Sequence, residues 1–234
     1  MTNRLLLTLA ITTAIATLAG CTDRIRIGEP VHETKVLELD KSEVTRVELT
    51  MGAGELRVTG NSPKLLEADF DYNSPGWKPV VDYHSTGVRG DIQISNSASA
   101  AIHGESKWNL RFNDSALMDL VVKMGAGEAH LNLGSLNLRS VAFNLGAGEV
   151  DVDLRGTPKR SYDVQINGGV GQATIHVPST VGISATAVGG IGEVNVRGLE
   201  KRNGRWINPL QENAPVTIRL DVKGGVGQID LVAE

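Results

Sequence analysis

Residues 121–156 read VVKMGAGEAHLNLGSLNLRSVAFNLGAGEVDVDLRG, and this stretch decides the fold because it contains one short motif twice. GAGE occurs at 125–128 and again at 146–149, with alternating apolar and polar residues around each copy. Such alternation is typical of a β-strand that buries one face. The stretch therefore predicts β-strands on both sides of each glycine motif.

The motif recurs through the chain, and no segment shows a sustained helical period. From residue 125 onward the copies begin 21, 23, 21 and 35 residues apart, whereas 73 residues separate the first copy from the second. The long last interval contains a polar insertion at 199–214, and residues 87–92 in the first interval are interpreted as a degraded copy. Self-similarity at a fixed period indicates a repeat architecture. The further copies are GAGE at 52–55, GVGQ at 169–172, GIGE at 190–193 and GVGQ at 225–228.

The apolar positions change parity at each motif. Val141, Phe143 and Leu145 precede the motif at odd numbers, whereas Val150 and Val152 follow it at even numbers. In a straight strand one of these sets would lie on the wrong face. Glycine accepts positive φ and close backbone contact, so each motif is predicted to be a corner, with a hairpin turn as the alternative. The predicted corner glycines are Gly52, Gly54, Gly125, Gly127, Gly146, Gly148, Gly169, Gly171, Gly190, Gly192, Gly225 and Gly227.

One repeat is too small to bury its own apolar face, so neighbouring repeats are expected to share a core. The predicted fold is all-β, a right-handed parallel β-solenoid (β-helix) with repeats of about 21 residues. An antiparallel β-sandwich is the alternative. Stacking would align the last residue of each motif in a ladder, and whether this ladder binds calcium stays open because calcium needs six to eight oxygens. The ladder consists of Glu55, Glu128, Glu149, Gln172, Glu193 and Gln228.

The N-terminus has the features of a targeting signal. Residues 1–20 contain a basic start and a short apolar run, and the sequence LAGC at 18–21 resembles the lipobox of bacterial lipoproteins. That resemblance implies cleavage before Cys21 and lipidation of its thiol, with residues 21–34 as a tether. The protein is therefore expected outside the cytoplasm, anchored to the membrane by lipid, and on the outer membrane facing the periplasm if the organism is Gram-negative.

The rest of the chain resembles the bacterial toast-rack family. The resemblance rests on TMGAGELRVTG (50–60), DFDYNSPGWKPVVDY (69–83) and KWNLRFND (107–114), together with residues 121–156. The GGVGQ and GGIGE repeats further on resemble adhesin-like and LiaF-like β-repeat domains. The resemblance implies the fold and supplies no catalytic residues. It divides the chain into a toast-rack-like part at 35–120 and a continuous repeat part at 121–234.

Composition limits the function. The net charge of -4 argues against a nucleic-acid partner, and the single cysteine excludes an internal disulfide. No catalytic, metal or cofactor motif is found, so a non-enzymatic envelope lipoprotein is expected, presenting a scaffold or adhesion surface to an unknown protein or glycan. The alternatives are a glycan-binding or glycan-cleaving β-helix and a LiaF-like regulator of envelope stress. Trp77 and Trp108 are candidate contact residues, unless they close the end of the solenoid.

Overall fold

The computed structural model describes residues 28–96 and 104–234, which form β-strands and one short 3-10 helix, η1 (Pro75–Trp77). This confirms the all-β class. The long strands are β2 (Val44–Thr59), β7 (Met118–Asn132), β8 (Leu138–Asp153), β9 (Tyr162–Val177), β10 (Gly182–Arg197) and β13 (Thr217–Ala233). The short strands are β1 (Val31–Leu37), β3 (Leu66–Tyr72), β4 (Val80–Ser85), β5 (Arg89–Ser95), β6 (Ser106–Phe112), β11 (Glu200–Arg202) and β12 (Arg205–Ile207).

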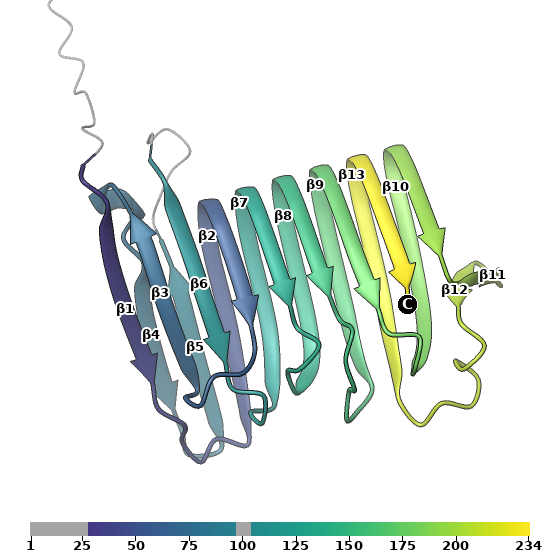
Figure 1. Cartoon of the computed structure of the whole chain (residues 1–234), viewed down its shortest axis with the longest axis horizontal. Coiled ribbons are helices and arrows are strands. Elements are labelled where there is room, and N and C mark those ends of the chain that lie inside the picture. Colours follow the sequence, from purple (N-terminus) through teal and green to yellow (C-terminus); the bar gives the residue numbers. More distant parts are fainter. Residues whose placement is uncertain (1–27, 97–103) are drawn as a thin grey trace, which may run out of the picture.

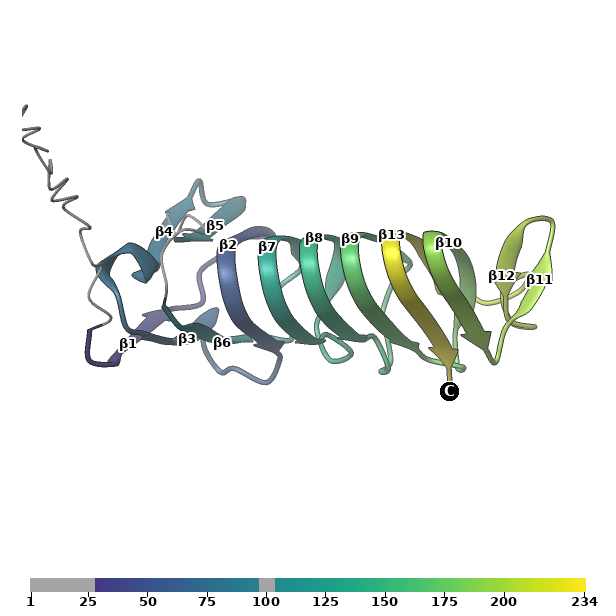
Figure 2. The same ribbon diagram turned by 90° about the horizontal axis from the view of Figure 1, so that it is seen from above.

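Each long strand folds over at its glycine motif, so that it has a first arm before the motif and a second arm after it (Figure 1). The bent strands lie side by side in one row, which we call the stack (Figure 2). Neighbours in the stack pair in parallel and in register through both arms. The second glycines of the motifs consequently form a continuous line, in the spatial order Gly54, Gly127, Gly148, Gly171, Gly227 and Gly192.

Both arms direct their apolar residues into one core. On β8, Val141 and Phe143 of the first arm and Val150 and Val152 of the second arm are all buried. The parity change at the motif is what places both sets inside, because the chain reverses direction between them. The polar residues between them face solvent on the two outer faces of the stack.

Gly148 shows why the bend requires glycine. Its φ is 133°, in the region that side-chain-bearing residues rarely adopt. A Cβ atom at this position would lie 1.9 Å from the carbonyl oxygen of Gly127 on the neighbouring strand. Both the backbone angle and the close packing of adjacent corners therefore exclude a side chain here.

The long interval between the first two motifs contains one more layer of the stack. β5 pairs in parallel with the first arm of β2, and β6 pairs in parallel with its second arm. The two arms of this layer are joined through residues 96–105 in place of a glycine motif, and 97–103 lie outside the described residues. The repeat is therefore degraded at its corner, while its arms are retained.

The interpretation of residues 87–92 as a degraded corner is wrong. These residues include the turn of the antiparallel hairpin between β4 and β5. The backbone N–H of Thr86 donates to the carbonyl of Arg89 at 3.0 Å, and Gly87 has a φ of 86°. Glycine is favoured there because the chain makes a tight hairpin turn. A short motif does not distinguish a glycine at such a turn from a glycine at a corner of the stack.

The order of layers in space differs from their order in the chain. β2 lies between β7 and the layer formed by β5 and β6, and β13 lies between β9 and β10. Repeats that follow one another in the sequence are therefore not neighbours in space at either end of the stack. Within the insertion at 199–214, Asn208 holds the start of β10 by accepting from the N–H of Ile183 and donating to the carbonyl of Val181.

Antiparallel pairing is confined to the ends of this mostly parallel sheet. β1 pairs with β3 and β3 with β6 at one end, with β4 and β5 paired beside them. At the other end β10 pairs with β12, and β12 pairs with β11. The sheet does not close on itself, and the antiparallel sandwich is wrong for the central layers. The hand of winding and the 21-residue repeat stay predictions.

Residues 31–34, expected in the tether, belong to β1 because they complete the sheet against β3.

Candidate functional site

The last residues of the motifs form a ladder along the second arms of the stack. Glu55, Glu128 and Glu149 are consecutive register partners, whereas the insertion of β13 places Gln228 beside Gln172. Adjacent strands lie about 4.8 Å apart, so three like charges follow one another at this spacing. The complete ladder in spatial order is Glu55, Glu128, Glu149, Gln172, Gln228 and Glu193.

The first carboxylate of the ladder is compensated by basic side chains. Arg57 Nε donates to Glu55 Oε1 at 2.9 Å, and Lys107 Nζ lies 3.6 Å from Oε2. The hydrogen bond from Arg57 is the main cause that lowers the pKa of Glu55. Further along, His130 Nε2 lies 4.0 Å from Glu128 Oε2. In the parts of the chain that the structure describes, no three His, Cys, Asp or Glu side chains form a group that could hold a metal ion.

The middle residues of the motifs form the apex of the corners. They are alanines at Ala53, Ala126 and Ala147, and they become larger along the stack as Val170, Val226 and Ile191. The exposed fractions of these last three residues are 55%, 46% and 73%. They form an apolar ridge, which sequence reasoning missed. The change from GAG to GVG and GIG was the available signal.

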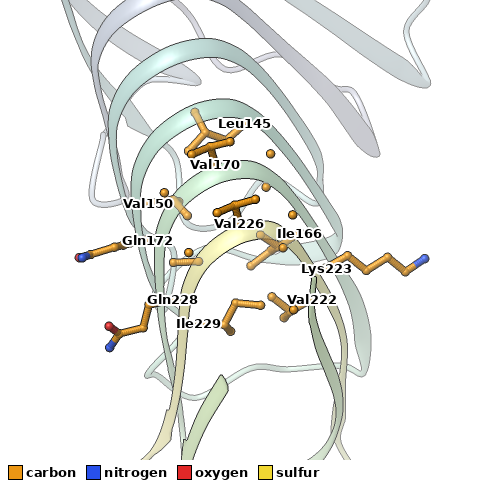
Figure 3. A pocket seen from close by; sticks show the side chains of 18 of the residues that line it. Leu145, Val150, Ile166, Val170, Gln172, Val222, Lys223, Val226, Gln228 and Ile229 are labelled. Atoms are coloured by element: carbon orange, nitrogen blue, oxygen red, sulfur yellow. The ribbon is translucent and has the colours of Figure 1, made fainter. Parts of the chain in front are cut away.

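The corners beneath this ridge lack a side chain that fills the earlier corners. Met124 and Leu145 are buried directly before their motifs, and the register positions that follow are Gly168 and Gly224. A small cavity of about 30 Å³ lies there (Figure 3). Its lining includes the apolar side chains of Leu145, Val150, Ile166, Val222 and Ile229.

The two glycines that begin GGVGQ are expected to respond oppositely to alanine. A Cβ at Gly168 would meet no atom closer than 4.0 Å, whereas a Cβ at Gly169 would lie 2.2 Å from the carbonyl oxygen of Gly146. Gly168→Ala should stabilise the protein by about 0.4–1 kcal/mol, because it restricts the unfolded chain, and Gly169→Ala should destabilise it. Urea unfolding measures both changes. Shifts of both midpoints in the same direction would refute this account of the corner.

The predicted contact role of Trp77 and Trp108 does not fit their positions. Their exposed fractions are 3% and 1%, and the Trp108 ring packs edge-on against Phe70 with 5.7 Å between ring centroids. They belong to the core at the end of the stack where β3 and β6 cover it, which agrees with the alternative that aromatic residues close this end. Cys21 lies outside the described residues.

The geometry defines a class of protein: a β-repeat protein with stacked, bent strands joined at glycine corners. No helix within 28–96 or 104–234 has the length and apolar character needed to cross a bilayer. The chain belongs to the toast-rack family, since the family model for the N-terminal domain of toast_rack (DUF2154) matches residues 26–176, more than half of its length.

A solved structure shares this architecture. The crystal structure of a "putative cell adhesion protein" from Clostridium sporogenes is 29% identical, with a TM-score of 0.85, and the match covers 88% of this chain and 100% of that chain. A "putative adhesin" from Bacteroides fragilis is 10% identical with a TM-score of 0.35, over 87% of this chain and 97% of that chain. No curated protein matches the sequence.

Proposed function

We propose that this protein is a non-enzymatic adhesion protein of the cell envelope, which presents the stack as a binding surface. The observation that supports this most strongly is the similarity to the Clostridium sporogenes protein, which extends over the whole of that chain at 29% identity. That protein is described as a cell adhesion protein, and we extend an adhesive role from it to this chain.

The architecture suits display of a surface. In-register parallel ladders hold the side chains of equivalent positions in rows, so a polymeric ligand would meet the same chemistry at regular intervals. Many copies on one cell would add avidity to weak individual contacts. The exposed ridge of Val170, Val226 and Ile191 adds apolar area to this surface.

The proposal includes a lipid anchor at Cys21. Two or three acyl chains stabilise membrane attachment far more than one, because each buried CH₂ contributes about 0.8 kcal/mol. Residues 22–30, between Cys21 and the start of β1, would then connect the lipid to the folded part. The anchor places the stack at the membrane surface.

Cys21→Ser is expected to release the protein from membranes, because the serine hydroxyl cannot receive the lipid through a thioether. Fractionation of cells followed by immunoblotting measures the distribution, with the wild-type chain as control. If the variant stays in the membrane fraction, attachment does not depend on this residue and the lipoprotein assignment fails.

The adhesive role is tested with a strain that lacks the gene. Attachment to neighbouring cells and to extracellular matrix should fall at least about tenfold, because avidity from many displayed copies is lost. The wild-type gene should restore attachment, and the Cys21→Ser gene should not, since released protein no longer bridges two surfaces. Equal attachment by the deletion strain and its parent would overturn the proposed function.

A further inference from the structure

The second arm of β10 forms a free edge of the sheet. On one side, β10 pairs with β13 through both arms, from Gly182 to Arg197. On the other side, within the part of the chain that the structure describes, only Ser184 and Ala185 of the first arm are paired, with β12. Residues 193–197 therefore present unpaired backbone N–H and C=O groups on this side, and such an edge can accept a further strand.

The core is only partly covered at this edge. Val194 and Val196 point inward from the second arm and are partly buried, whereas their register partners on β13, Ile229 and Leu231, are fully buried. A hollow of about 710 Å³ lies along the edge, and its lining includes both valines and Trp206 of β12. A further strand on the edge would exclude water from these valines, which favours its binding.

Two opposite charges on the outer face of this edge lack compensation within the stack. Glu193 and Arg197 are both exposed, and their register partners on β13 are Gln228 and Val232, which carry no charge. Glu193 and Arg197 stand four residues apart, about 13 Å along an extended strand, so they do not reach each other. Each is therefore available to an opposite charge on a partner.

The sequence of this edge is complementary to itself in the antiparallel direction. It reads EVNVR from residue 193 to residue 197. When Asn195 of one copy lies opposite Asn195 of a second copy, Glu193 of each copy lies opposite Arg197 of the other. In the same register, Val194 lies opposite Val196. Opposed residues of an antiparallel pair project from the same face, so the charges meet on the outer face and the valines meet on the inner face.

Other registers lose this match. A shift of one residue sets a valine opposite a charged side chain, because every side chain changes face relative to its partner. A shift of two residues keeps the faces but separates Glu193 from Arg197. Opposite charges that face each other across two strands stabilise the pairing, so the register centred on Asn195 is favoured.

The strand at the opposite edge of the sheet, β1, is a poorer partner for β10. Its charged side chains already have partners in their own stack: Lys35 Nζ lies 3.1 Å from Glu33 Oε1, and His32 Nδ1 lies 2.8 Å from Asp71 Oδ1. Pairing of β10 with β1 of another copy would also leave a free edge at each end and form open polymers. Pairing of β10 with β10 is two-fold symmetric and closes as a dimer.

The position of β10 suits contact between copies on two cells. β1 and β10 lie at opposite ends of the stack (Figure 1). The proposed anchor, Cys21, precedes β1 in the chain by ten residues. It would hold the β1 end near its membrane and leave the β10 end farther from it. A two-fold axis through Asn195 then places the two anchors at opposite ends of the dimer.

We propose that a second copy of this chain docks on the second arm of β10, by antiparallel pairing of residues 193–197 centred on Asn195, and that this pairing joins copies on two neighbouring cells. The inference rests on the proposed adhesive function and names its partner and its site. Each dimer gains two ion pairs between Glu193 and Arg197 and covers the valines between them. The single contact is small, and many displayed copies add avidity to it.

Sedimentation velocity of the full-length protein in excess detergent micelles tests the pairing in solution. The wild type should form dimers and no larger species. Arg197→Glu and Glu193→Arg should each weaken the dimer at least about tenfold, because two-fold symmetry replaces two attractive pairs with two repulsive ones. An equimolar mixture of both variants should regain the wild-type affinity, since each variant carries charges opposite to those of the other. This recovery would also show that the variants are folded.

Lys223→Glu is the matched control for these variants. It makes the same change of charge as Arg197→Glu, at an exposed residue on the first arm of β13, away from the free edge. It should change the association by less than about twofold.

The same variants test the contact between cells. A strain that carries Arg197→Glu and a strain that carries Glu193→Arg, labelled in two colours, should attach to each other at least about tenfold better than either attaches to itself. Immunoblotting of the membrane fractions checks that both variants are present in equal amounts.

Three results would overturn the dimer proposal: a wild type that is monomeric at about 100 μM or forms open polymers, unchanged association in both charge variants, or a mixture that does not regain affinity. The attachment assay separates this failure from failure of the proposed function. If the parent strain attaches better than the deletion strain while both charge variants attach to themselves as well as the parent does, adhesion stands and the β10 edge is not its site.

Discussion

Replacing Gly148 with valine is expected to destabilise the protein by at least about 3 kcal/mol. The residue adopts a φ of 133°, and the new Cβ would lie 1.9 Å from the Gly127 carbonyl oxygen. The chain cannot relieve this contact locally, because Gly127 is held in turn by its own neighbour, Gly54. Urea unfolding monitored by circular dichroism measures the loss as a lower midpoint.

Ala147→Val is the matched control for this substitution. Ala147 is exposed at the apex one residue earlier, and its register partner on the next strand is already a valine, Val170. The same side chain is therefore expected to change stability by less than about 0.5 kcal/mol at this position. Equal midpoints for Gly148→Val and Ala147→Val would show that the second glycine does not require its conformation.

Removal of residues 217–234 is expected to disorder β10 as well as to delete β13. β13 pairs with β9 on one side and with β10 on the other through both arms. It also buries five aliphatic side chains, worth about 7–15 kcal/mol together. These are Ile218, Leu220, Val222, Ile229 and Leu231. Limited proteolysis with mass spectrometry should find cleavage within β10, while β7 and β8 stay protected.

A second deletion controls for the general effect of shortening this region. Replacing residues 200–207 with a glycine-serine linker removes β11 and β12, and β12 pairs with β10 only through Ser184 and Ala185. The stack should keep its protection in that variant. If β10 instead stays protected after removal of β13, it must pair directly with β9, and the inserted position of β13 is dispensable for the fold.

Much of the fold could be predicted from the sequence, because local rules decide it. The change of parity between Leu145 and Val150 requires the chain to bend if both residues are buried, and both are. The same argument predicts a shared core but says nothing of aromatic residues outside the repeats. Trp77 and Trp108 were therefore open to two interpretations. Their burial depends on long-range contacts, such as the pairing of Trp108 on β6 with Phe70 on β3.

Which equivalent residues lie side by side was less predictable than the fold. Asn144 and Asn167 stand at equivalent places before their motifs, so their proximity could have been inferred from the repeat spacing. Lys223 occupies the same place in the last motif, but in chain order β10 would separate it from Asn167. Only the insertion of β13 beside β9 makes them neighbours.

The sequence by itself determined that the strands are bent, that the glycines mark the bends and that the chain belongs to an all-β repeat class. Tertiary structure alone decided which layer lies beside which. The physical reason is that every long strand presents nearly the same inward aliphatic pattern and the same backbone ladder, so local interactions scarcely distinguish one neighbour from another. The order of the layers is decided by the connecting segments and by the strands at the two ends of the stack. At one end β5 and β6 lie outside β2, and at the other the insertion allows β13 to lie between β9 and β10.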